Sequence, residues 1–232
     1  MTFLWPWVGQ VSATPVNISI PIGVVIKQCT VPGTIALTYD DGPDSYTPDL
    51  IALLNQYQAH ATFFVLGSSL EDEDNARTLE LMVASGHQTN RASSYDHAHL
   101  PTLSRGMIRK KMADIEDAIR DVLDYAPTYM RPPYLETNPF VDNVMGEMAY
   151  HVIGADIDTK DYENDSPALI ANSFQKFVAQ LDAGGTVALL HDIQSMVGTL
   201  TRMILDELKW RGLRAVTIGE CLGAPKWTWY KV

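Results

Sequence analysis

Short apolar runs alternate along most of this chain with longer stretches in which apolar residues recur at helical spacing. The short runs are bounded by turn-forming residues, which predicts strands. The longest helical pattern covers residues 101–125, where apolar residues from Ile108 to Val122 recur about every 3.6 positions. The predicted strands are residues 34–39, 61–67, around 87–90, 127–134, 151–158, 185–192 and 214–220, and the predicted helices are 46–58, 75–86, 101–125, 139–149, 167–183 and 199–212.

This alternation indicates an α/β fold. Seven predicted strands separated by six predicted helices imply parallel βαβ units. The simplest arrangement closes them as a barrel, and a doubly wound open sheet is the alternative. No repeat, low-complexity tract or Gly/Ser linker divides the sequence. We therefore predict one domain over residues 31–232, preceded by an N-terminal extension of residues 1–30.

The composition is that of a globular protein that does not bind nucleic acid. Of the 232 residues, 46% are hydrophobic and 19% are charged, and the formal net charge is −11. An acidic chain lacks the basic surface that phosphate binding needs. No apolar run reaches the roughly 18 residues of a membrane span. The first residues are apolar but lack a basic segment, so we do not expect an intact signal peptide there.

Two features bear on cellular location. The two cysteines, Cys29 and Cys221, lie near opposite ends of the chain. They are either buried thiols of a reducing cytosol or a disulfide of an exported protein. Two sequons, at Asn17 and Asn164, permit glycosylation. We favour export, to the medium or the cell wall.

Adjacent carboxylates close the first apolar strand pattern. Asp40 and Asp41 follow residues 34–39 and are followed at once by Gly42 and Pro43. Like charges at neighbouring positions repel, but a bound cation would dominate the local field. One carboxylate could then bind the metal while the other removes a proton from water, as in metal-assisted hydrolysis. The alternative is an ordinary surface turn.

Further polar residues lie at other strand ends. Arg131 precedes two prolines, His191 ends the run LLHD, and Asp156, Asp158 and Asp161 fall within DIDTKDY. Taken singly, each has a structural explanation, as an ion-paired arginine, a structural histidine and a solvated turn. All of them lie at or just beyond the carboxyl ends of predicted strands, which is the face of a barrel that carries active sites.

These motifs together resemble the polysaccharide deacetylase family of carbohydrate esterases. TYDDGP, RPPY, DTKDY and LLHD occur in that order, and the likeness spans residues 29–222. The flanking runs CTVPGTIALTYDDGP and TIGECLG are most similar to fungal chitin deacetylases. The resemblance implies a distorted, incomplete (β/α) barrel that removes N-acetyl groups with a divalent metal, usually zinc, for which cobalt can substitute. It also implies a disulfide between Cys29 and Cys221.

The resemblance assigns roles to the charged residues. It implies that Asp40 is the general base, that Asp41 is a metal ligand and that His191 is the general acid, which protonates the departing amine. Arg131 matches the arginine that holds the base, and Asp161 matches the acid that orients the catalytic histidine.

Further matches concern the substrate pocket. The backbone N–H of Tyr134 would stabilise the oxyanion of the tetrahedral intermediate. Tyr162 and Leu189 match residues that form the wall of the acetyl-methyl pocket. Two positions depart from the family pattern: Tyr162 stands where tryptophan is usual, and Leu135 replaces a common glycine.

The metal motif departs further. The family has two histidine ligands four residues apart, and alignment on YDHAHL puts His97 at the second. The first falls on Ser93, a poor zinc ligand, with one extra residue upstream. Water or Ser93 could complete a weak site, or His87, Asp96 or His99 could supply the third ligand. Loss of the metal would leave a fold that binds sugar without cleaving it.

We therefore predict a monomeric, metal-dependent chitin deacetylase that acts on chitin or chito-oligosaccharides and serves chitin degradation. The first alternative is a catalytically silent carbohydrate-binding protein, because the metal motif is incomplete. The second is a deacetylase of acetyl-xylan or peptidoglycan, because the motifs describe the acetyl group and not the path of the sugar chain.

Overall fold

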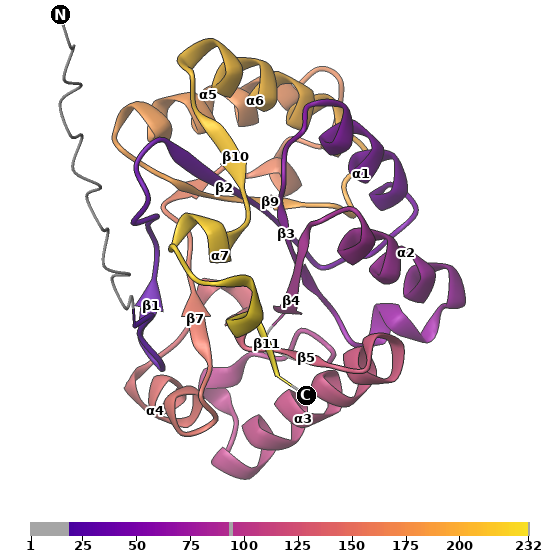
Figure 1. The fold of residues 1–232 in the computed structure, drawn as a ribbon, viewed down its shortest axis with the longest axis vertical. Helices are drawn as coiled ribbons and strands as arrows, with labels where there is room; N and C mark the ends of the chain where they lie inside the picture. The colour runs from indigo at the N-terminus through magenta and orange to yellow at the C-terminus, as the bar shows by residue number, and fades with distance from the viewer. Residues whose placement is uncertain (1–18, 93–94, 232) are drawn as a thin grey trace, which may run out of the picture.

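Parallel strands form one curved sheet in the computed structural model, which describes residues 19–92 and 95–231. Eight strands follow one another in the order β1-β7-β6-β4-β3-β2-β9-β8, and β10 also pairs with β2 (Figure 1). They are β1 (Val25–Ile26), β2 (Thr34–Asp40), β3 (Thr62–Val65), β4 (Gln88–Ala92), β6 (Tyr129–Arg131), β7 (His151–Ile153), β8 (Ile157–Asp158), β9 (Val187–His191) and β10 (Arg214–Val216). A separate antiparallel pair joins β5 (Ala126–Pro127) to β11 (Tyr230–Lys231).

Helices surround the sheet (Figure 1). The α-helices are α1 (Thr47–Gln56), α2 (Glu73–Ala84), α3 (Arg105–Leu123), α4 (Pro139–Glu147), α5 (Ile170–Asp182), α6 (Val197–Arg211) and α7 (Ile218–Cys221). Short 3-10 helices are η1 (Ser68–Glu71), η2 (Leu100–Thr102), η3 (Pro133–Leu135), η4 (Asp161–Glu163) and η5 (Lys226–Thr228). The six long α-helices match the six predicted ones, and the parallel half-barrel confirms the predicted fold class.

The number of parallel strands in the described residues is nine, against about seven predicted. One addition is β1, which lies in the predicted N-terminal extension and pairs with β7. The other arises because the predicted strand 151–158 is two strands, β7 and β8. These lie near opposite ends of the strand order although only residues 154–156 separate them, so the two edges of the sheet lie close together.

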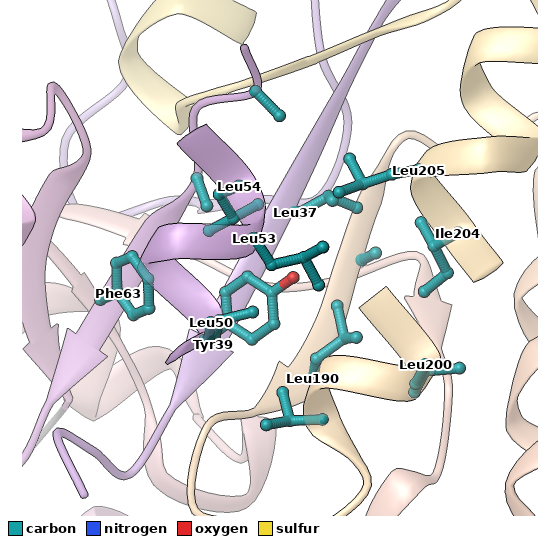
Figure 2. Packing of buried hydrophobic residues seen from close by; sticks show 14 of the residues in the cluster. Leu37, Tyr39, Leu50, Leu53, Leu54, Phe63, Leu190, Leu200, Ile204 and Leu205 are labelled. Atoms are coloured by element: carbon teal, nitrogen blue, oxygen red, sulfur yellow. The ribbon is translucent and has the colours of Figure 1, made fainter. Parts of the chain in front are cut away.

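Alternation along the strands separates two apolar layers. Leu37 and Tyr39 of β2 point toward the helices and pack against α1 and α6, and Figure 2 shows part of this cluster. Ala36 lies on the opposite side of β2 with Phe64, inside the barrel. Since side chains alternate from one face to the other, Asp40 at the end of β2 also faces the interior.

The amino-terminal end of the barrel is filled by α7. The predicted strand 214–220 is wrong beyond Val216, because Thr217 caps α7 in a capping box with Glu220. The first two amides of α7 donate to side chains inside the barrel, Ile218 N to Thr62 Oγ1 (2.8 Å) and Gly219 N to Gln88 Oε1 (2.8 Å). These bonds satisfy helix-terminal N–H groups that would otherwise be buried without partners.

The predicted disulfide is present. Cys29 and Cys221 are bonded, with Cα atoms 4.9 Å apart, and join the segment before β2 to α7. The sequon at Asn164 is buried: the residue is 8% exposed, and its side-chain nitrogen donates to Lys160 O (2.9 Å). A glycan on that nitrogen does not fit this packing, whereas Asn17 lies outside the described residues. Within the described residues, no helix has the length and apolar character that crossing a bilayer requires.

Candidate active site

All the predicted catalytic, metal and pocket residues except Asp161 line one cavity at the carboxyl ends of the strands. Its volume is about 440 Å³. The cavity is lined by Asp40, Asp41, His97, Arg131, Pro132, Pro133, Tyr134, Leu135, Asp158, Tyr162, Leu189, His191, Ile193 and Gln194. A larger groove of about 910 Å³ lies at the amino-terminal ends of β2 and β10 and contains none of the predicted site residues.

Asp40 is held by a buried ion pair. Arg131, which is 2% exposed, donates from Nη1 to Asp40 Oδ1 (2.7 Å) and to Thr38 Oγ1 (2.7 Å). Its other nitrogens donate to the carbonyl groups of Ile153 and Gly154. Burial raises the pKa of Asp40, and the charge of Arg131 opposes that rise. The predicted contact between the two residues is therefore present, and it fixes the direction of the carboxylate.

Asp41 points toward a different partner. Its Oδ1 lies 3.5 Å from His97 Nε2, whereas Asp40 faces Arg131. Both Asp41 (φ 74°) and His97 (φ 55°) have left-handed backbones, which few non-glycine residues adopt. Strained backbones of this kind cluster at ligand sites. The two neighbouring carboxylates therefore face different partners, which reduces the repulsion expected between adjacent like charges.

The turn after the aspartates requires glycine. A Cβ on Gly42 would lie 2.1 Å from Asp192 Oδ2. Asp192 is 1% exposed and accepts a hydrogen bond from Thr47 Oγ1 (2.6 Å). Burial raises the pKa of Asp192 to about 7, although the bond from Thr47 opposes the rise. Sequence reasoning gave Asp192 no role, and its place in LLHD directly after His191 was the available signal.

His191 is oriented by Asp161. Its Nδ1 lies 2.8 Å from Asp161 Oδ1, and its backbone N–H donates to Asp161 Oδ2 (2.7 Å). Burial by itself lowers the pKa of the imidazole, but Asp161, together with Asp40 and Asp41, raises it to about 9. No group among residues 19–92 and 95–231 bonds Nε2. Since β2 and β9 pair in register at Asp40 and His191, these two side chains leave adjacent strands side by side.

The remaining predicted pocket residues border the same cavity. Tyr134 has a left-handed backbone (φ 57°), and its N–H has no acceptor in the described part of the chain. The ring of Tyr162 meets the His191 ring edge-on, with centroids 5.4 Å apart. Leu189 borders the cavity, whereas the next residue, Leu190, packs on the helix side of the sheet. Asp158, Ile193 and Gln194 are lining residues to which sequence reasoning gave no specific role.

Two side chains of the kinds that bind cations, Asp41 and His97, lie close together in the described residues. The 3.5 Å between Asp41 Oδ1 and His97 Nε2 suits two ligands of one divalent ion, and a carboxylate with an imidazole is a donor set that zinc accepts. No group of three or more His, Cys, Asp or Glu side chains within residues 19–92 and 95–231 is arranged to hold a metal. Ser93 lies outside the described residues.

None of the other three candidate ligands lies at this point. His87 is 2% exposed before β4, at the far end of the barrel, where its Nδ1 accepts from the Ala61 N–H. Asp96 pairs with Lys111 (2.7 Å) on α3. His99 contacts the carboxylate of Glu136 on the other side of Tyr134. Spacing in sequence did not reveal these partners, because each belongs to a different element.

A parallel barrel that carries an arginine-paired aspartate, an aspartate-paired histidine and a further Asp–His contact at its carboxyl end has the groups that metal-assisted hydrolysis needs. The sequence profile described as Polysaccharide deacetylase matches residues 27–153, more than half of the chain. A chitin deacetylase of Colletotrichum lindemuthianum is 40% identical over 232 residues, covering 96% of this chain and 93% of that protein. The chain therefore belongs to the polysaccharide deacetylase family, whose members are generally divalent-metal enzymes.

Other comparisons agree on the fold. The solved structure of the Colletotrichum enzyme superposes with a TM-score of 0.88 at 41% identity, covering 91% of this chain and 97% of that one. Two Arthroderma benhamiae relatives match 94% of this chain: a probable peptidoglycan-N-acetylglucosamine deacetylase (43% identical) and a chitin deacetylase (44% identical). The chain spans only 50% and 59% of their respective lengths.

Proposed function

We propose that this chain hydrolyses N-acetyl groups of N-acetylglucosamine polymers, with chitin or chito-oligosaccharides as substrate. One observation carries the proposal: Asp40 and His191 lie in register on adjacent strands and border one cavity, each held by its own partner. Burial raises the pKa of Asp40, and Arg131 opposes that rise by favouring the ionised form, while Asp161 favours the protonated form of His191. A base and an acid in opposite protonation states are what amide hydrolysis requires.

The chain's own residues support each proton transfer. Asp40 accepts a proton from water as the water oxygen adds to the acetyl carbonyl carbon. The N–H of Tyr134 donates to the oxyanion that forms. His191 then gives its Nε2 proton to the amide nitrogen as the C–N bond breaks, which releases acetate and a free amine. Leu189 and Tyr162 form the wall beside the acetyl methyl group.

A divalent cation, zinc or cobalt, fits Asp41 and His97, and when bound it would supply positive charge at the acetyl carbonyl and make the attacking water more acidic. Catalytic zinc sites usually have three protein ligands and one open position. With two described ligands, the expected affinity is weaker than that of a complete site.

Chitin is favoured over other acetylated polymers because the Colletotrichum chitin deacetylase matches this chain over nearly the full length of both proteins. The disulfide supports an oxidising compartment, and hence secretion or a cell-wall location. Acetyl-xylan and peptidoglycan remain alternative substrates, and the protein is proposed to act as a monomer.

Acetate release tests the proposal. The chelated protein is mixed with chitin oligomers, acetyl-xylan or peptidoglycan, and zinc or cobalt is then titrated in. Acetate is expected from chitin oligomers after metal addition, and neither Asp40→Ala nor His191→Ala is expected to release it. Asp49→Ala, which removes an exposed carboxylate on α1, is the matched control and should retain activity. Acetate release that persists in both site variants would refute the assignment.

The two-ligand site favours one second candidate, a carbohydrate-binding protein without hydrolytic activity. This candidate predicts binding of chitin oligomers by calorimetry but no acetate at any zinc or cobalt concentration. The same titration therefore separates the two candidates.

A further inference from the structure

Two loops that border the cavity are joined by side-chain contacts to which the proposed chemistry assigns no role. His99 Nε2 contacts the carboxylate of Glu136. The Tyr134 ring lies between two histidines, meeting the His97 ring at 4.5 Å (75°) and the His99 ring at 5.9 Å (80°), edge-on in both cases. Each contact links residues 97–99 to residues 134–136. We refer to His99 and Glu136 as the clamp pair.

The loop that the clamp pair reaches has an unusual backbone. Tyr134 (φ 57°) and Leu135 (φ 55°) are consecutive left-handed residues, and neither is glycine. Such conformations persist only where the surroundings hold them. The next two backbone N–H groups form turn hydrogen bonds, Leu135 N to Pro132 O and Glu136 N to Pro133 O (both 3.0 Å). Of the three N–H groups, that of Tyr134 is therefore the one available to donate a hydrogen bond into the cavity.

The same contacts constrain the opposite loop. His97 also has a left-handed backbone (φ 55°), and its ring packs on Tyr134 while its Nε2 faces Asp41. A shift of residues 134–136 would therefore move both the oxyanion donor and the cation-binding imidazole. Small displacements of catalytic groups matter, since a displacement of about 1 Å can reduce the rate about 100-fold.

We propose that His99 and Glu136 are positioning residues that hold the Tyr134 amide and the His97 imidazole in register across the cavity. This inference rests on the proposed deacetylase function. Their side chains are 41% and 57% exposed, and exposed pairs contribute little to global stability. The pair therefore acts on geometry, and removing it changes turnover much more than it changes the melting temperature.

Kinetics provide the first test. Glu136→Ala and His99→Ala are each expected to lower kcat about 10-fold or more with KM within about twofold, because the chemical step and not sugar binding is disturbed. The double variant should lose no more than His99→Ala alone, because that variant already lacks the contact with Glu136 as well as the one with the Tyr134 ring. Glu136→Gln, which keeps an acceptor oxygen at the same place, should restore most of the rate. Glu163→Ala is the matched control.

This control removes a pair of similar exposure on another loop beside the cavity. Lys160 and Glu163 lie 2.7 Å apart with side chains 38% and 51% exposed, and loss of their contact should leave kcat unchanged. Glu136→Ala with an unchanged kcat overturns the inference, as does an equal loss of kcat in Glu163→Ala.

Nuclear magnetic resonance of the chelated protein provides a readout independent of metal and activity. Glu136→Ala should shift the Tyr134 amide and His97 ring resonances, whereas Glu163→Ala should leave both in place. If the wild-type protein releases no acetate but these shifts occur, the proposed function fails and the positioning of the two loops stands. If the resonances do not move in Glu136→Ala, the positioning role is refuted whether or not the protein is active.

Discussion

Replacing Asp192 with asparagine is expected to flatten the pH dependence of the protein's stability. Asp192 is 1% exposed, and its Oδ2 accepts from Thr47 Oγ1 at 2.6 Å. Its Oδ1 is buried and finds no hydrogen-bond partner in the part of the chain that the structure describes. Burial raises the pKa from an ordinary 3.8 to about 7, even though the bond from Thr47 opposes the rise.

The sign of the effect follows from where the proton binds more tightly. The folded protein holds the Asp192 proton more strongly than the unfolded chain does, so ionisation favours unfolding. This contribution to stability is fully present below the ordinary pKa of 3.8 and is lost as the pH rises through about 7. The difference between these two values corresponds to about 4 kcal/mol of unfolding free energy.

The amide of Asp192→Asn cannot ionise, so the variant should gain about 4 kcal/mol relative to wild type between about pH 4 and pH 8. A buried amide nitrogen without an acceptor costs about 1 to 3 kcal/mol, but this cost is the same at every pH. Urea unfolding of the chelated proteins, followed by tryptophan fluorescence, measures the difference at each pH. Asp49→Asn on α1 is the control for loss of an exposed carboxylate. Parallel pH profiles of wild type and Asp192→Asn would refute the reasoning.

Three further predictions concern the acid, the disulfide and a buried ion pair. In Asp161→Asn, the pKa of His191 should fall from about 9, because burial still lowers it while the hydrogen bond and charge of Asp161 no longer raise it. A midpoint that stays near 9 in a histidine NMR titration of chelated protein would contradict this. Changing Cys29 and its partner to serine should lower the free energy of unfolding in urea by up to about 5 kcal/mol, because the disulfide closes a very long loop; unaltered stability would oppose that view. Glu116→Gln removes the carboxylate that lies 3.0 Å from the fully buried Arg91. The change should lower the free energy of unfolding by about 3 kcal/mol, or the melting temperature by roughly 6 to 12 °C. A calorimetric shift below about 2 °C would show that other contacts compensate.

Local sequence signals predicted the individual elements better than their pairing. The apolar run 34–39 is β2, because its residues pack on both faces of the sheet. The run 151–158 is continuous in sequence, but its halves pair with different strands, a tertiary outcome that no local pattern contains. The helix α7 could have been predicted from the sequence, since Thr217 and Glu220 have the spacing of a capping box. That signal was outweighed by the β-branched residues before it.

In the site, too, local motifs predicted individual residues better than contacts between distant elements. The motifs brought Asp40, Arg131, Asp161 and His191 together, and their pairings are those that the family resemblance implied. Asp192 was not predicted, because its burial depends on the close approach of Gly42 from another loop. The three candidate third ligands could not be ranked by spacing, since their partners lie on distant elements.

The barrel is filled at one of its two ends. The helix α7 lies across the amino-terminal end, opposite the cavity that contains Asp40 and His191. On the proposed function, α7 blocks that end to acetate formed beneath a bound sugar, so its release would be coupled to the polymer lifting or sliding. Turnover on long chains would then depend on how readily the polymer lets go.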